Sequence, residues 1–240
     1  MKETLDILYQ DEHFIAVNKP CGLLVHRSPI DRRERRFALQ IIRNQTGQHV
    51  FPVHRLDKPT SGILLFALSS EAAKGMSDLF RANQVLKTYI AVVRGYTREN
   101  GTIDHGLRAL DDRPGAKNSK SDNVFHAVTD YRRISTIELP YAVDKYPTAR
   151  YSFVELHPRT GRRHQLRRHM KHISHPIIGD TRYGTGVHNR FFRERFNSSR
   201  LLLAAVKLEF VHPFTKEAVC IDSEPGGAFQ SVVDELFNYK

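Results

Sequence analysis

The stretch His54-Arg-Leu-Asp-Lys-Pro-Thr-Ser-Gly62 is followed at once by the apolar run Ile63-Leu-Leu-Phe-Ala-Leu68. Pro59 and Gly62 predict a tight polar loop, and the uninterrupted apolar run predicts a buried strand. A polar loop held by a buried strand is a rigid place to mount a catalytic group. This junction therefore predicts both a core element of the fold and the position of a functional side chain.

Asp57 is the one carboxylate in this loop, where His54, Arg55 and Lys58 surround it. Neighbouring positive charge stabilises a carboxylate and lowers its pKa. We therefore expect Asp57 to be ionised at neutral pH and able to act as a nucleophile or a base. The same pattern is also compatible with a structural Asp57 that caps a turn or anchors Arg55.

Strand and helix signals come in groups along the chain. Strands are predicted at residues 7–9, 14–17, 63–68, 88–94, 124–134, 149–156 and 201–211, with a further extended run at 23–26. A helix with one apolar face is predicted after Ser69 or Ser70, either of which can cap it. Further helices are predicted at 162–172 and at 229–237. Strict alternation of strands and helices is absent, which predicts an α+β fold with a mixed, mainly antiparallel central sheet flanked by helices and loops. One domain over residues 1–240 is expected, and the polar stretch Gly101–Asn123 predicts a long loop.

The charge of the chain indicates a polyanionic partner. Its 240 residues include 37 Lys and Arg against 26 Asp and Glu, a formal net charge of +11. Nucleic acid is the commonest partner of so basic a protein. The excess is concentrated in segments 27–36, 157–175 and 182–200, which could line one groove and attract phosphates. A solvated cationic surface is the alternative.

The predicted helix at 162–172 carries cations around most of its circumference, namely Arg162, Arg163, Arg167, Arg168 and Lys171. Arg163 and Arg167 are four residues apart, a spacing that is repulsive on a helix unless an anion lies between them. We therefore expect this segment to contact phosphate. The first basic segment adds Arg27 as a candidate RNA contact.

Several classes of protein are excluded or disfavoured. No apolar run is long enough for a membrane span, and the N-terminus has no apolar signal core. Cys21 and Cys220 form no CxxC pair, so a disulfide scaffold or zinc finger is not expected, and the cytoplasm is the expected compartment. The spacing of His164, His169, His172 and His175 matches neither His-Glu-x-x-His nor a mixed Cys/His site, and their cationic neighbours oppose a metal ion.

The loop around Asp57 resembles the signature of the RluA-type pseudouridine synthases. Other blocks resemble that family in the same order: residues 18–26, Lys87-Thr-Tyr89, 160–167, 175–180, Tyr183-Gly184 and His212-Pro213. Segments 7–12, 24–28, 47–51, 68–72 and 146–151 are similar to the members that modify uridine 65 of tRNA. The first block begins close to residue 1, so no separate N-terminal S4-type RNA-binding domain is expected.

The resemblance implies the pseudouridine synthase fold and an isomerase that needs no cofactor or metal. Such enzymes break the uracil N1–C1′ bond, rotate the freed base and join C5 to C1′. Asp57 would act at the sugar, as a nucleophile at C1′ or as a base at C2′. Arg167 would hold Asp57 in an ion pair, and Tyr89 would stack on the uracil or assist removal of the C5 proton.

The resemblance also implies contacts with the RNA. Arg55 would fill the space of the extruded base or bind phosphate, with His54 beside it, and Leu203 would contact the base. Where relatives usually have His, this chain has Ala204, which puts any role for that position in doubt. The expected partner is tRNA, bound by a monomer without an obligate protein partner or membrane. A non-catalytic RNA-binding module and an enzyme acting on ribosomal RNA are the alternatives, and a metal-dependent nuclease is disfavoured because segment 157–175 has no carboxylate.

Overall fold

The computed structural model describes residues 3–27, 34–110 and 123–237. It divides into two compact units. The first comprises residues 1–87, 109–122 and 205–223, and the second comprises 88–108, 123–204 and 224–240. The expectation of one domain over residues 1–240 stays a prediction, and each unit is described by itself below.

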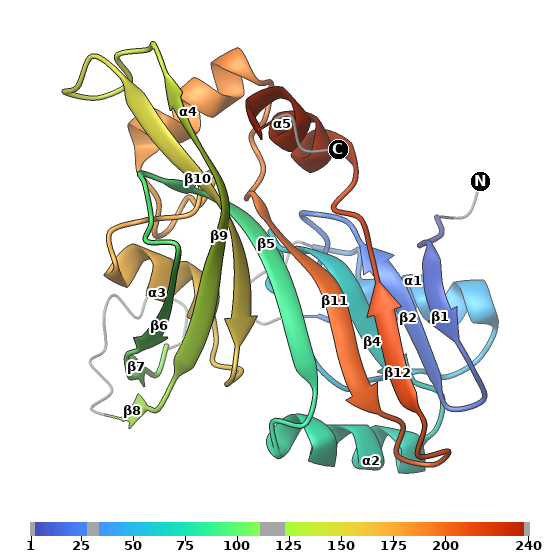
Figure 1. Ribbon diagram of the computed structural model, residues 1–240. Helices are drawn as coiled ribbons and strands as arrows, with labels where there is room; N and C mark the ends of the chain where they lie inside the picture. The colour runs from blue at the N-terminus through green and yellow to red at the C-terminus, as the bar shows by residue number, and fades with distance from the viewer. Residues whose placement is uncertain (1–2, 28–33, 111–122, 238–240) are drawn as a thin grey trace. The chain divides into compact units, whose positions relative to one another are not determined.

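The sheet of the first unit is built around β4 (Ser61–Ala67), every residue of which is buried. Strands β1 (Ile7–Gln10) and β2 (Phe14–Lys19) form an antiparallel hairpin, and β2 pairs antiparallel with β4. The residues of β11 (Leu203–Val211) from Ala205 onward follow on the other side of β4, with β12 (Ala218–Asp222) beyond and the short β3 (Phe51–Pro52) also paired to β4. Figure 1 draws β1 and β2 in blue and β11 and β12 in orange to red.

Helices α1 (Ala38–Thr46) and α2 (Ser70–Arg81) complete the first unit. The Ser69 side chain accepts a hydrogen bond from the Ala72 N–H at 3.0 Å, and Glu71 lies in the first turn, where it favours the positive end of the helix dipole. Ala72 and Met76 of α2 pack into a core cluster with β2, β4, β11 and β12. The predicted cap and apolar face of α2 are therefore confirmed.

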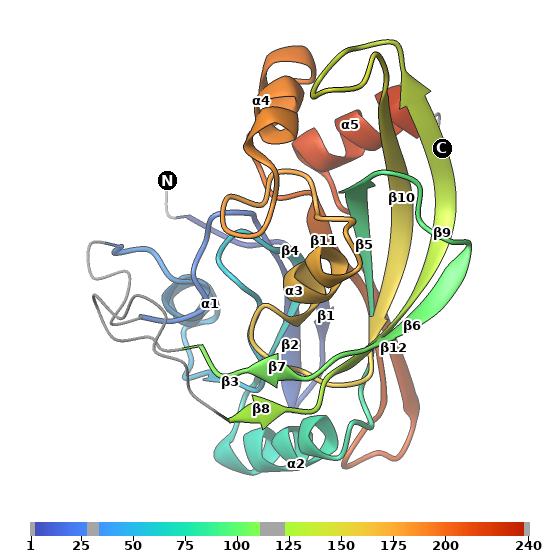
Figure 2. The same cartoon turned by 90° about the vertical axis from the view of Figure 1, so that its left-hand side faces the viewer.

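The second unit is an antiparallel sheet in the order β5, β10, β9, β6. The residues of β5 (Leu86–Arg94) from Thr88 onward pair with β10 (Ala149–Pro158), and β9 (Val128–Leu139) and β6 (Asn100–Asp104) follow. A separate ribbon joins β7 (Leu107–Arg108) to β8 (Val124–Phe125). Helix α3 (Gln165–His172) covers one face, as Figure 2 shows, through Leu166 and Met170. Helices α4 (Gly186–Arg195) and α5 (Gly227–Phe237) complete the unit.

The predicted α+β class, with mainly antiparallel pairing, is confirmed, whereas four local predictions are wrong. The strand predicted at 124–134 is interrupted after Phe125, and its two parts, β8 and β9, belong to separate sheets. The run 23–26 forms no strand, because after the turn at Gly22 only Leu24 makes an isolated bridge, to Phe37. The helix predicted from residue 162 begins at Gln165, because His164 adopts a left-handed backbone with φ 54°. The expected loop from Gly101 contains β6 and β7, which pair with β9 and β8; residues 111–122 of that stretch lie outside the described residues.

Gly62 is the second residue of the buried strand β4, and its geometry generates a stability prediction. Its φ is +105°, and a Cβ there would lie 2.0 Å from the Ala205 carbonyl oxygen. Gly62→Ala is therefore expected to cost about 3 kcal/mol or more of the free energy of unfolding, because neither backbone can move aside. Urea unfolding measures the effect, with Gly186→Ala as the control, since that Cβ would meet nothing within 4 Å. Similar midpoints for the two variants would contradict the close approach.

Candidate active site

Asp57 lies on a tight turn directly before β4 in the first unit. The Thr60 N–H donates to the Asp57 carbonyl at 3.0 Å and closes the turn. The carbonyl of the next residue, Lys58, accepts from the Gly22 N–H at 2.9 Å. The half-buried Asp57 carboxylate is therefore mounted on a backbone fixed by two segments of chain.

Lys19, at the end of β2, is the cation that fixes this turn, and sequence reasoning missed it. Its side chain is fully buried, and Nζ donates to the carbonyls of Pro20 at 2.9 Å, Leu23 at 2.8 Å and Lys58 at 3.2 Å. A buried ammonium needs such acceptors to offset its lost hydration. Burial of Lys19 thus ties segment 18–23 to the Asp57 turn. The available signal was the block 18–26, in which the lysine precedes a Pro-Cys-Gly turn.

The predicted cationic neighbours of Asp57 take different positions. Lys58 forms an ion pair with Glu34 at 3.2 Å. The Arg55 side chain is exposed, and its charge adds to burial in lowering the pKa of His26. Arg27 is also exposed in this unit. Exposure of Arg55 and Arg27 is compatible with the phosphate contacts predicted for them, which stay predictions.

His54 has a structural role that sequence reasoning did not assign. Its Nε2 accepts a hydrogen bond from the Leu65 N–H at 2.9 Å, so the ring proton is on Nδ1. The ring stacks on Phe80 at 4.9 Å between centroids. Burial, reinforced by the charge of Lys87, lowers the pKa of His54 to about 3. His54 therefore anchors the loop to β4 as a neutral side chain, and its predicted contact with RNA stays a prediction.

The second unit brings together Tyr89 and Leu203. Tyr89 of β5 pairs with Leu156 of β10 and packs, half-buried, against the core cluster that contains Leu203. Leu203 itself is almost fully buried. Ala204, where the resemblance led us to expect His, is fully buried and contributes packing without a polar group.

Arg167 lies inside the second unit, not on a surface of α3. Its Nε donates to Asp180 Oδ2 at 2.7 Å and its Nη2 to Asp180 Oδ1 at 2.9 Å. Asp180 Oδ1 also accepts the N–H groups of Arg182 and Tyr183, and the Tyr183 ring lies 5.2 Å from the guanidinium carbon of Arg167. Burial acts to raise the pKa of Asp180, but hydrogen bonds from Arg167 and Tyr183 leave it below its usual range.

This pair corrects the expectation of a helix with cations around its circumference. Arg162 and Arg163 precede α3, and the buried Arg167 is paired with the carboxylate of Asp180. The ion pair expected between Arg167 and Asp57 stays a prediction. Asp180 lies in the block 175–180, so the family resemblance, but no pattern of charge, could have singled it out.

The remaining cationic candidates surround α3 and the β7–β8 ribbon. Arg162 is exposed, donates to the His126 carbonyl at 3.0 Å and lies over Phe125. Arg168 donates to the Arg108 carbonyl at 3.0 Å, Lys171 is exposed, and Arg163 is half-buried. These side chains form a cationic surface of the second unit, and their RNA contacts stay predictions.

Within residues 3–27, 34–110 and 123–237, no group of three His, Cys, Asp or Glu side chains is arranged to hold a metal ion. His169, for example, is buried between Thr129 Oγ1 and the His105 carbonyl, each at 3.0 Å, and burial lowers its pKa to about 4. No helix in the described part of the chain is long and apolar enough to cross a membrane.

The His54 contact predicts a pH dependence of stability. The pKa of His54 is about 3 in the folded protein and about 6.5 for an unperturbed histidine. The unfolded chain therefore takes up a proton as the pH falls below about 6.5, and the folded chain does so only near 3. Between pH 7 and 5, His54→Gln should lose about 2 kcal/mol less of its unfolding free energy than the wild type. Urea unfolding at both values checks this, with His126→Gln, an exposed site, expected to follow the wild type.

The Arg167–Asp180 pair predicts a large loss of stability when one partner is removed. Asp180→Ala leaves a buried guanidinium without this carboxylate, at an expected cost of about 3–5 kcal/mol of unfolding free energy. Asp78→Ala, which breaks the exposed Arg81–Asp78 pair on α2, is the control and should cost well under 1 kcal/mol. Equal, small losses in urea unfolding would contradict a structural role for Asp180.

Comparison with known proteins identifies the family. The sequence pattern of the RNA pseudouridylate synthase family matches residues 13–172. The chain is 50% identical over 233 residues to tRNA pseudouridine synthase C of Vibrio vulnificus, covering 97% of this chain and 95% of the relative. The protein of the same name from Pasteurella multocida is 53% identical over 219 residues, covering 91% and 90%.

Solved structures agree with this result. The human RNA pseudouridylate synthase domain containing 1 has a TM-score of 0.70 at 27% identity, covering 93% of this chain and 84% of that one. The human domain containing 4 has a TM-score of 0.70 at 25% identity, covering 96% and 92%. The chain therefore belongs to the RNA pseudouridylate synthase family, and the predicted resemblance is confirmed.

Proposed function

We propose that this protein isomerises a uridine of tRNA to pseudouridine, and that the target is uridine 65. The observation that carries the choice of tRNA is the 50% identity, over almost the whole chain, to proteins named tRNA pseudouridine synthase C. Position 65 rests on the sequence resemblance. We place the reaction in the cytoplasm, with a monomer that needs no metal, cofactor or obligate protein partner.

The proposed chemistry is centred on Asp57. As a nucleophile, its carboxylate bonds to C1′ while the N1–C1′ bond breaks and the electron pair leaves with uracil. The base rotates, C5 bonds to C1′ and displaces the carboxylate, and the C5 proton is lost while N1 gains one. As a base, Asp57 takes the C2′ proton instead and returns it after the base has rotated. Both routes conserve all atoms, and the fixed backbone of the Asp57 turn supports either.

The other site residues are assigned supporting roles. Arg167 would pair with Asp57, and the bonds from its Nε and Nη2 to Asp180 would fix the guanidinium plane for that contact. Tyr89 would stack on the uracil or assist loss of the C5 proton, next to the apolar Leu203. Arg55 would fill the space of the base, which must be flipped out of its helix at a cost of a few kcal/mol.

RNA binding is assigned to exposed and half-buried cations. Arg162, Arg163, Arg168 and Lys171 of the second unit would bind phosphates, with Arg27 contributing from the first unit. The neutral His54 would contact the RNA without contributing a charge. A-form RNA is recognised through its backbone, 2′-hydroxyls and shape, so contacts dispersed over several elements suit such a substrate.

The variant Asp57→Asn tests whether catalysis can be lost while RNA binding is kept. Total tRNA and ribosomal RNA from cells without the protein, and from the same cells supplied with wild type or Asp57→Asn, should be mapped for pseudouridine. Wild type should restore pseudouridine at tRNA position 65, and Asp57→Asn should not, because loss of a nucleophile or base slows such reactions by about 10⁴ or more. Purified Asp57→Asn should still bind tRNA within about threefold of wild type, since phosphate contacts dominate affinity.

The control is Glu34→Gln, which removes another carboxylate near the same loop and should leave the modification intact. Equal loss of binding and isomerisation in Asp57→Asn would contradict a chemical role for Asp57. Restoration of pseudouridine in ribosomal RNA alone would overturn the choice of tRNA, and modification at another tRNA position would overturn uridine 65.

A further inference from the structure

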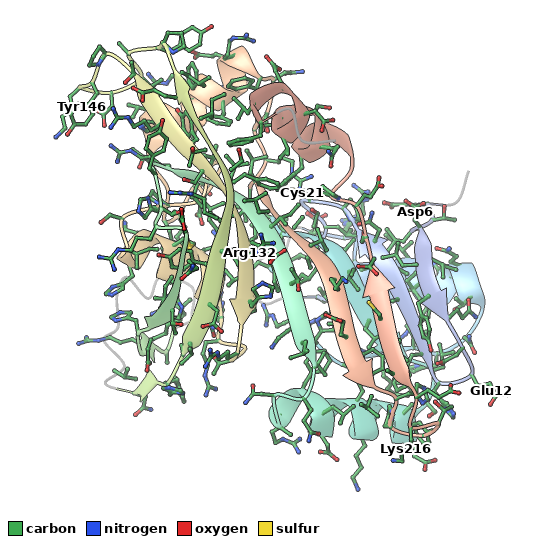
Figure 3. All side chains as sticks on the ribbon, viewed as in Figure 1. Asp6, Glu12, Cys21, Arg132, Tyr146 and Lys216 are labelled. Atoms are coloured by element: carbon green, nitrogen blue, oxygen red, sulfur yellow. The ribbon has the colours of Figure 1, made fainter. Side chains whose placement is uncertain are left out.

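The hairpin between β9 and β10 presents aromatic rings to solvent. Tyr146 is 57% exposed and Tyr141 is 39% exposed, so both rings are accessible to a ligand. The Nζ of Lys145 lies 5.2 Å from the centroid of the Tyr146 ring. Figure 3 shows Tyr146 at the tip of the hairpin, directed away from the strands. An exposed ring with a cation over it is thus held at the far end of the β9–β10 ladder.

Helix α4 adds cations to the same end of the second unit. The Tyr141 ring lies 5.3 Å from that of Phe191, and Arg195 Nε donates to the Tyr141 hydroxyl at 3.4 Å. Arg190, Arg193 and Arg195 are exposed on α4. Figures 1 and 2 both show α4 beside the hairpin tip. We call this surface the distal patch; it comprises Tyr141, Lys145, Tyr146, Arg190, Arg193 and Arg195.

The charge of the distal patch is positive and accessible. Arg193 lies 3.9 Å from Glu194, and Arg195 pairs with Glu235 at 2.9 Å, but all four side chains are about half exposed or more, and such pairs are weak. Within the described part of the chain, no carboxylate lies within ion-pair distance of Lys145 or Arg190. Phosphate can therefore bind without displacing a strong internal pair.

The distal patch is remote from Tyr89 on the same rigid sheet. Tyr89 pairs with Leu156 of β10, whereas Ala149, seven residues earlier in β10, pairs with Leu139 at the hairpin end. A strand rises about 3.3 Å per residue, which places the two ends about 23 Å apart. A nucleotide on the distal patch therefore cannot belong to the base pair opened at Tyr89.

We propose that the distal patch binds unpaired bases and phosphates of the substrate RNA at a position remote from the modified uridine. Exposed tyrosines stack on unpaired bases, and neighbouring arginines and lysines bind the phosphates that flank them. This combination favours RNA over an apolar protein partner, because four cations accompany two rings that keep polar hydroxyls. The proposal rests on the proposed function and deepens it, because the protein would then recognise the folded RNA as well as the modified uridine.

The test uses the double variant Tyr146→Ala with Arg190→Ala, both at exposed sites where the fold does not depend on the side chain. Its dissociation constant for the whole target tRNA should rise about tenfold, because one lost stacked base alone weakens binding by a factor of about 5 to 150. In a plot of the logarithm of the binding constant against the logarithm of the salt concentration, the slope should decrease by the equivalent of about one phosphate contact. Hydroxyl-radical footprints should lose protection at a remote group of nucleotides and keep it around the modified uridine.

Two controls separate the distal patch from general effects. Tyr146→Phe keeps the ring and should bind like the wild type, and Lys74→Ala removes an exposed cation of α2 and should leave the footprint unchanged. An unchanged footprint and affinity in the double variant would overturn the proposal, as would equal loss of protection around the uridine. If the double variant binds RNA like the wild type but has an altered oligomeric state, the distal patch is a protein contact and the proposal is overturned. Failure of the proposed function is distinct, because the wild type would then modify no tRNA.

Discussion

The buried ammonium of Lys19 is the constraint on which the Asp57 turn depends. A charge taken out of water must find acceptors of its own, and Lys19 finds them in the carbonyls of Pro20, Leu23 and Lys58. Two of these carbonyls belong to the segment after β2, and the third belongs to the turn before β4. The hydrogen bonds that replace the water around the Lys19 ammonium therefore join the two segments. His54 makes a second link, from the loop to the backbone of β4. The carboxylate proposed to do the chemistry thus rests on a backbone whose position is set by interactions it does not itself make.

The net charge counts all cations equally, but the structure separates buried cations from exposed ones. Lys19 and Arg167 are buried, and each fixes the chain of its own unit, Lys19 through backbone carbonyls and Arg167 through Asp180. Arg162, Lys171 and the arginines of α4 are exposed, so they are available to a polyanion. The distinction follows from desolvation, because a buried cation is stable only with internal partners, whereas an exposed one loses little when phosphate replaces water. A basic composition therefore predicts a nucleic-acid partner without saying which cations touch it.

Features that depend on local pattern could be predicted from the sequence. The continuous apolar run gave β4, and Ser69 with an apolar face at helical spacing gave α2. Features that depend on tertiary partners could not. The strand β6 buries only Ile103 and exists because β9 pairs with it, and α4 lies in a basic stretch in which only His188 and Phe192 are buried. Asp57 could be singled out as a lone carboxylate among cations. Asp180 could not, because its ion pair with Arg167 depends on the tertiary structure, which places residue 180 beside α3.

In the proposed enzyme, strand β10 connects the residue that contacts the target base with the distal patch. One end of it pairs with Tyr89 and the other leads into the hairpin that carries Tyr141 and Tyr146. The pairing of β10 with β5 and β9 keeps the two contacts at least seven strand residues apart. An RNA that satisfies both must present a uridine and unpaired nucleotides at that separation, which a folded tRNA can do and an isolated stem cannot. Specificity for one uridine then arises from distance within the folded RNA, without any side chain having to read the sequence around the base.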